Sequence, residues 1–141
     1  MSISQGNCGL DIGVVCSDSS IAVGKIVQGD GTDTTNNQKV VKVASASTQA
    51  PIGVTMDSTS SEDAQVTIRV EGIVDLVVDG SGTAIDIGTK IISEAAGVGI
   101  AMAAIGQPNQ EVLGIALAPS SASGDRIPVL IARQSSCKGA A

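Results

Sequence analysis

Two stretches, Ile52-Gly53-Val54-Thr55-Met56 and Leu113-Gly114-Ile115-Ala116-Leu117, carry the same pattern of an apolar strand with a glycine inside it. A Ser-rich turn follows each stretch, and a second strand of alternating character returns at residues 65–70 and 126–131. The two copies align without a gap at an offset of 61 positions. The pattern predicts a tandem duplication of one β unit.

A second matched piece lies upstream of each copy and extends the duplication. Ile21-Ala22-Val23-Gly24 precedes the first copy, and Ile85-Asp86-Ile87-Gly88 precedes the second at an offset of 64. The pseudo-repeats therefore span about residues 19–79 and 83–133. Each half alone is small for a stable domain, so we expect one β domain over residues 17–133 in which the halves share a core.

The apolar residues favour strands over helices throughout. The 141 residues include 16 Ile and 16 Val but only 5 Leu, and no Phe, Tyr or Trp. Side chains branched at Cβ are stiff and suit a pleated sheet. Residues 93–104 are the one segment where a helix competes, but Gly97 and Gly99 favour a hairpin with strands near 91–93 and 98–101.

Local patterns give further expectations for individual residues. Alternation over residues 65–71 predicts that Arg69 faces water and that Gly72 ends the strand. Pro128 cannot donate a backbone hydrogen bond, which predicts an edge strand or a bulge. Leu130 is apolar on the outward face of the same strand, which indicates contact with another surface.

The two ends of the chain are poor in core-forming residues. Residues 1–16 contain three glycines and one short apolar stretch, and are expected to form an extended arm whose last residues join a strand. Residues 134–141 form a short polar tail.

The composition lacks the parts of most catalytic sites, so we expect no enzyme activity. There is no His or Tyr to act as an acid or base, and no Ser–His or Cys–His pair. Asp75 and Asp79, on one face of a strand, read as solvated surface, and Asp30 and Asp33 as part of a flexible turn rather than a calcium loop. No cofactor or metal is expected.

The three cysteines, Cys8, Cys16 and Cys137, leave two interpretations open. A Cys8–Cys16 or Cys16–Cys137 disulfide competes with reduced thiols that are buried or lie in the tail. Without His, a closed zinc site would need a ligand from outside the chain.

The charge and hydropathy exclude two classes of partner. The net charge is −6 and no aromatic ring is present, so neither phosphate neutralisation nor base stacking favours nucleic-acid binding. The apolar runs are far shorter than a membrane span, and no Lys or Arg precedes Lys25, as a secretory signal would require. We expect a soluble, non-secreted protein with neither nucleic-acid nor membrane contacts.

The order of the repeated phrases resembles that of the small decoration, or cement, proteins of tailed-bacteriophage capsids. The likeness covers roughly residues 21–131. Two features depart from the pattern, a long insertion at residues 29–38 and the lack of aromatic residues. The phrases that carry the resemblance are Ile21-Ala22-Val23-Gly24-Lys25-Ile26-Val27, Ala50-Pro51-Ile52-Gly53-Val54, Val70-Glu71-Gly72-Ile73-Val74-Asp75-Leu76, Ile85-Asp86-Ile87-Gly88 and Val112-Leu113-Gly114-Ile115-Ala116-Leu117.

The resemblance implies an all-β fold, a single compact β-sandwich or barrel of β-clip or β-tulip-like type. It also implies a homotrimer on the outer surface of the icosahedral head, at local three-fold positions, bound to the major capsid protein and stabilising the shell against the pressure of packaged DNA. Such a protein would be assembled in the host cytoplasm.

Two groups of residues are the candidates for contact under this resemblance. Deleting residues 1–15 is expected to leave a folded body that no longer binds capsids. The N-terminal arm supplies candidate capsid contacts, and the outward face of the last strand supplies candidate subunit or capsid contacts: Ser2, Ile3, Ser4, Gln5, Asn7, Leu10 and Ile12 in the arm, and Pro128 and Leu130 in the strand.

Two alternatives belong to other classes. Similar phrases occur in carbohydrate- or ligand-binding β-clip modules, although sugars usually stack on aromatic rings that this chain lacks. Another virion component, such as a tail protein, would instead form elongated particles.

Overall fold

The structure, a computed structural model, describes residues 9–31, 40–46, 49–102 and 110–135 and is nearly all β. A single 3₁₀ turn, η1, interrupts the strands among these residues. The elements are β1 (Gly9–Cys16), β2 (Ile26–Gly29), β3 (Val40–Val43), β4 (Pro51–Thr55), β5 (Ala64–Asp79), β6 (Lys90–Ser93), η1 (Ala95–Gly97), β7 (Gly99–Ala101), β8 (Glu111–Ala116) and β9 (Ser123–Ser135). The expected all-β class is confirmed.

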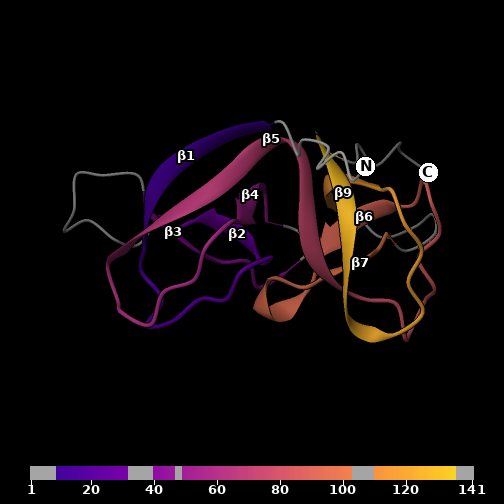
Figure 1. The fold of residues 1–141 in the computed structure, drawn as a ribbon, viewed down its shortest axis with the longest axis horizontal. Coiled ribbons are helices and arrows are strands. Elements are labelled where there is room, and N and C mark those ends of the chain that lie inside the picture. Colours follow the sequence, from indigo (N-terminus) through magenta and orange to yellow (C-terminus); the bar gives the residue numbers. More distant parts are fainter. Residues whose placement is uncertain (1–8, 32–39, 47–48, 103–109, 136–141) are drawn as a thin grey trace, which may run out of the picture.

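Strand pairing closes two five-stranded rings that share the long strand β5. The first runs β1-β3-β2-β4-β5 and returns to β1, and the second runs β5-β7-β6-β8-β9 and returns to β5. We call residues 9–71 the first barrel and residues 72–135 the second barrel. Figure 1 shows them as two neighbouring halves, with β5 passing from one to the other.

The β5 strand continues through Gly72, where the sequence pattern predicted its end. Gly72 has a φ of 99°, a conformation that glycine adopts without strain. It pairs with Gly9 of β1 on one edge and with Ile131 of β9 on the other. The prediction of a break was wrong because the glycine bends the strand as its partner changes, and the ladder continues (Figure 1).

Two apolar clusters form the core, and one of them joins the barrels. The first barrel encloses residues such as Val14, Val66 and Ile68. The second cluster contains Leu76 and Val129 of the second barrel, and also takes in residues of β2 and β4 from the first: Ile26 and Val54. Burial of this apolar surface holds the two halves together.

The hairpin expected near residues 91–101 is confirmed. β6 and β7 pair antiparallel, with Ile92 opposite Ile100, and η1 forms their connection. The positive φ of Gly97, 68°, lies in this connection and explains why a helix does not continue.

The prediction that Pro128 marks an edge or a bulge was wrong. β9 lies between β5 and β8, and Pro128 stands opposite Asp75 in a regular part of the ladder. The Pro128 carbonyl accepts a hydrogen bond from the backbone N of Leu117, one residue beyond the end of β8. The imide nitrogen faces the same side as that carbonyl, where the β8 ladder has ended, so no ladder bond needs a donor there.

Residues 9–16 belong to the first barrel rather than to an arm. β1 pairs with β5 from Gly9 to Cys16, and Val14 and Val15 are buried. Deleting residues 1–15 would remove most of β1, so we now expect this truncation to disturb the first barrel as well as any capsid contact. Residues 1–8 lie outside the described part of the chain.

Candidate functional site

The metal-ligating side chains of the described residues are scattered rather than gathered. They contain no group of three or more Cys, Asp or Glu placed to hold a metal ion. In the same part of the chain, no helix has the length and apolarity to cross a membrane. Cys16 is a free, buried thiol, and burial raises its pKa. Its possible partners, Cys8 and Cys137, lie outside the described residues.

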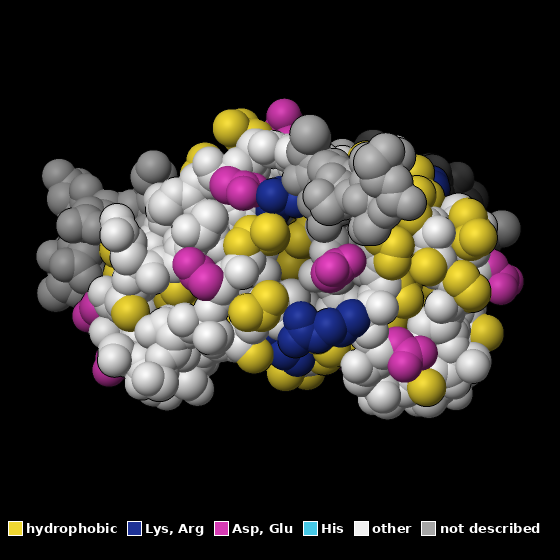
Figure 2. Space-filling model, viewed as in Figure 1, with side chains coloured by type: hydrophobic (Ala, Val, Ile, Leu, Met, Phe, Trp, Pro, Cys, Tyr) yellow, Lys and Arg dark blue, Asp and Glu magenta, His cyan; other side chains and the backbone are white. Residues whose placement is uncertain are grey.

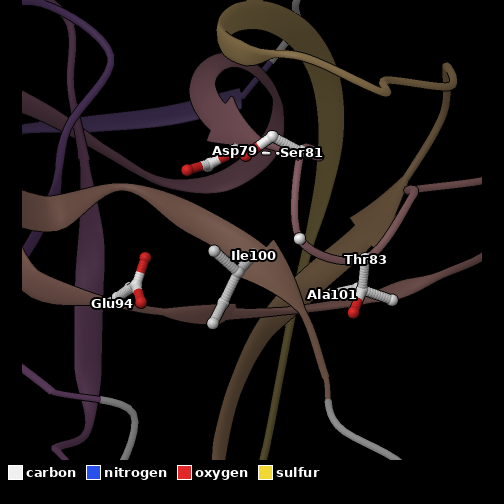
Figure 3. Close-up of a pocket in the computed structure, with 7 residues that line it drawn as sticks. Asp79, Ser81, Thr83, Glu94, Ile100 and Ala101 are labelled. Carbon is white, nitrogen blue, oxygen red and sulfur yellow. Dashed lines mark hydrogen bonds between the residues drawn. The ribbon is translucent and has the colours of Figure 1, made fainter.

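A shallow pocket lies between the end of β5 and the β6–β7 hairpin (Figure 3). Its acidic residues are Asp79 and Glu94, which approach from different elements. The Asp79 carboxylate accepts hydrogen bonds from the backbone N of Ser81 at 2.9 Å and from its hydroxyl at 2.6 Å, which lower the pKa of Asp79. The carboxylate therefore caps its own turn, and the pocket offers no acid–base pair.

The two barrels match residue by residue in their hydrogen bonds. The backbone N of Gly24 donates to the carbonyl of Thr55 at 3.0 Å, and Gly88 donates to Ala116 at 2.8 Å. The conserved offsets of 64 and 61 seen in the sequence thus describe equivalent positions in three dimensions. Side-chain differences between equivalent positions then show where the barrels have different roles.

One such difference is an ion pair in the first barrel. Arg69 stands opposite Asp11 on β1, and its Nε and Nη2 donate to the carboxylate at 2.7 and 3.1 Å. Its Nη1 donates to the carbonyl of Ile73 at 2.8 Å. These contacts lower the pKa of Asp11, chiefly through the hydrogen bond from Arg69. Arg69 is only 7% exposed, so the prediction that it faces water was wrong.

The equivalent pair in the second barrel is apolar. Ile73 stands opposite Leu130, and Leu130 stands opposite Ile115 on β8, so three apolar side chains cross adjacent strands in one row. Leu130 is 39% exposed, and Leu117, one residue beyond the end of β8, is 37% exposed. We call Ile73, Ile115, Leu117, Pro128 and Leu130 the outer apolar face of the second barrel.

The candidate contact residues fall into three groups. Pro128 and Leu130 lie together on the outer apolar face. Leu10, the second residue of β1, is 52% exposed, whereas Ile12 is partly buried and packs on the first core. Ser2, Ile3, Ser4, Gln5 and Asn7 lie outside the described residues.

Sequence reasoning missed the exposed turn at Ile87, which is 70% exposed and is the most prominent apolar side chain among the described residues. The repeat itself could have pointed to it, because Ile87 aligns with Val23 and neither lies in a strand. In the view of Figure 2, hydrophobic side chains are exposed over the half that carries β6, β7 and β9. Most of the few Lys and Arg side chains on this face lie near the junction of the halves.

Three comparisons with known proteins place this chain among others. Residues 26–131, which include most of both barrels, match the phage cement protein family. A search of curated protein sequences finds no match. Among solved structures, the chain is similar to the N base of head fiber gp8.5 of bacteriophage phi29, with a TM-score of 0.64 and 16% identity, over 87% of this chain and 93% of that one. That likeness concerns the fold, and the family match over three quarters of the sequence identifies the chain as a member of the phage cement protein family.

Proposed function

We propose that the protein is a capsid decoration protein that binds the outer surface of the phage head. The family match over residues 26–131 is the observation that carries this proposal. The finer parts of the proposal are binding to the major capsid protein at local three-fold positions, a homotrimeric state, assembly in the host cytoplasm and stabilisation of the shell against packaged DNA. The similar solved structure is named as the base of a head fiber, which fits a protein that works at the head.

The architecture supports a structural rather than an enzymatic role. Two closed barrels sharing one strand give a rigid body in which most of the strand edges are paired. The net charge of −6 disfavours competition for the packaged genome. Both features suit a protein that clamps a surface and performs no chemistry.

Residues 1–8 are the proposed capsid-binding arm, since residues 9–16 are built into the first barrel. A segment that orders on a partner pays an entropic cost, which several copies held in one oligomer can offset through avidity. Ser2, Ile3, Ser4, Gln5 and Asn7 remain in this arm, and Leu10 lies where it meets the body.

A co-sedimentation titration tests the proposal. Purified protein is mixed with expanded heads that lack it, and bound protein is measured on gels because the chain has no Trp or Tyr. We expect saturation at three copies per three-fold site and weak binding to unexpanded heads. A chain lacking residues 2–8 should bind at least about tenfold more weakly while a chain lacking residues 136–141 binds normally. Absence of pelleting by the full chain at every concentration would refute the proposal.

A further inference from the structure

The outward face of β2 and β4 in the first barrel is covered within the chain. Ile26 and Val54, neighbours across these strands, are fully buried although they point away from the first core. The covering elements belong to the second barrel. Gly97 of η1 donates its backbone N to the carbonyl of Ala44 at 2.9 Å, and a Cβ at Gly97 would come 2.7 Å from the carbonyl oxygen of Ile26.

The C-terminal half of β5 covers the same face from another side. Its Ile73 carbonyl accepts the hydrogen bond from Arg69, and the backbone N of Val77 donates to the carbonyl of Gly24 at 2.9 Å. The turn at Gly24 is therefore docked. A Cβ at Gly24 would meet Val77 Cγ2 at 3.3 Å.

The equivalent face of the second barrel is open. Lys90 and Ile115, which pair as Ile26 and Val54 do, are exposed and half-buried, respectively. The equivalent turn projects freely, because Ile87 is 70% exposed and no atom lies within 4 Å of a Cβ at Gly88. The outward face of the first barrel is thus buried within the chain, whereas the equivalent face of the second barrel is exposed. Leu130 on the exposed face takes the place of Arg69.

We infer that this open face, formed by the outer apolar face of the second barrel and the turn at Ile87, receives a second copy of this chain in a head-to-tail manner. The covered face of the first barrel shows that a surface of this shape fits a barrel of this same fold. The covering strand is the C-terminal half of β5, and its equivalent in the first barrel is β1. Ile12 of β1 pairs with Ile68, just as Val74 of β5 pairs with Val129. β1 of the incoming copy is therefore the element placed against Leu130.

The part of β1 that this arrangement brings toward Leu130 carries one charged and one apolar side chain. The position on β1 equivalent to Ile73 is Asp11, whose neighbour Leu10 is 52% exposed. In the docked arrangement Leu10 of the incoming copy lies near Leu130. These two residues, with Ile87 and Leu117, are the large apolar side chains that the described chain leaves exposed. The contact places Leu10 of one copy and Leu130 of the next against each other, which reduces their exposure to water.

A head-to-tail contact uses two different surfaces of each copy and closes into a ring when the rotation permits. Three copies closing in this way would form the trimer, so the inference deepens the proposed function and rests on it for the number of copies. It requires no capsid. Trimers that fail to bind heads would refute the proposed function alone, whereas capsid binding by a monomer would refute this inference alone.

Sedimentation velocity on the free protein tests the surface. We expect the native chain to sediment at about 42 kDa, three chains of 13.9 kDa, and both Leu130→Arg and Ile87→Ser to sediment as monomers with unchanged circular dichroism. Ser60→Arg, which adds the same side chain to an exposed loop of the first barrel, is the matched control and should remain trimeric. Should Leu130→Arg fail to fold, Ile87→Ser decides, because that side chain lies in an exposed turn.

A native monomer, or an oligomer that neither variant dissociates, would overturn the inference. Disulfide trapping tests the direction of the contact in a chain with Cys8→Ser and Cys137→Ser. Mixing Leu10→Cys and Leu130→Cys proteins should give cross-linked chains that neither protein gives alone. Cross-linking of Leu130→Cys with itself would indicate a face-to-face dimer and contradict the head-to-tail arrangement.

Discussion

Exchanging the ion pair of the first barrel for the apolar pair of the second tests whether the barrels are equivalent frameworks with different surfaces. The change is Asp11→Ile with Arg69→Leu, which copies Ile73 and Leu130 onto the positions that match them. In each pair the two residues stand directly opposite each other on antiparallel neighbouring strands, Asp11 and Arg69 on β1 and β5, and Ile73 and Leu130 on β5 and β9. The backbone can therefore accept either pair without a change of register.

The single changes are expected to differ because the two partners differ in exposure. The Arg69 side chain is 9% exposed, so Asp11→Ile leaves a nearly buried cation without its carboxylate and should cost about 3 kcal/mol. The Asp11 side chain is 36% exposed and can hydrate, so Arg69→Leu should cost only about 1–2 kcal/mol, mainly the hydrogen bond to the Ile73 carbonyl.

The free energy of unfolding of the double variant should lie within about 1 kcal/mol of the native value. An apolar pair of similar shape leaves no charge unpaired. The coupling free energy from the double-mutant cycle is then about 3–5 kcal/mol, the summed cost of the single changes less the small cost of the double variant. Urea unfolding followed by far-ultraviolet circular dichroism at neutral pH measures all four proteins. Additive costs, with a coupling below about 0.5 kcal/mol, would show that the pair is not the unit we describe.

Three further predictions concern glycine packing and titration. Gly114→Ala should destabilise the fold by about 2–3 kcal/mol, since the new Cβ would overlap the carbonyl oxygen of Leu130, whereas Gly82→Ala, with no atom within 4 Å, should change the urea midpoint little. The pKa of Asp11 is lower in the folded than in the unfolded chain, so its contribution to stability is present above the unfolded value near 4 and lost as the pH falls through the folded pKa. Urea midpoints between pH 6 and 2 should therefore fall less in Arg69→Leu than in the native chain, and equal slopes would contradict the assignment. Burial raises the pKa of the Cys16 thiol, so its contribution to folding stability is present below the pKa of the unfolded chain and is lost as the pH rises above that value. Cys16 should therefore react with iodoacetamide only when the chain unfolds. Peptide mass mapping of alkylated native protein checks this, and rapid labelling of Cys16 in native conditions would count against its burial.

The duplication, the all-β class and the strand positions could be predicted because their causes are local in the sequence. Alternation with a period of two residues marks a strand whatever its partner is. Gly53 and Gly114 stood out for a reason that the structure now explains, since a Cβ at either would overlap the carbonyl oxygen of Arg69 or Leu130 on the paired strand. The apolar character of Leu130 on an outward face was also visible from alternation alone.

Partner strands decided the features that the sequence misassigned. Arg69 was expected in water because alternation gives the face of a side chain, but not what covers that face, and here the strand β5 bends back over it. Pro128 was assigned to an edge because the missing N–H is a local property, whereas the end of β8 opposite it is a property of another segment. Gly72 was predicted to end the strand because a glycine that bends a continuous strand looks the same in a sequence as a glycine that ends one.

The sequence by itself therefore determined that this protein consists of two copies of one β unit and lacks His and aromatic side chains, since strand pattern, turn residues and composition are all local properties of the chain. Only the tertiary structure decided that the copies share β5, that two rings close, and that one of two equivalent faces is buried while the other stays open. The physical reason is that each of these outcomes depends on contacts between segments distant in sequence, which bury Ile26 and Val54 and leave Ile87 and Leu130 exposed.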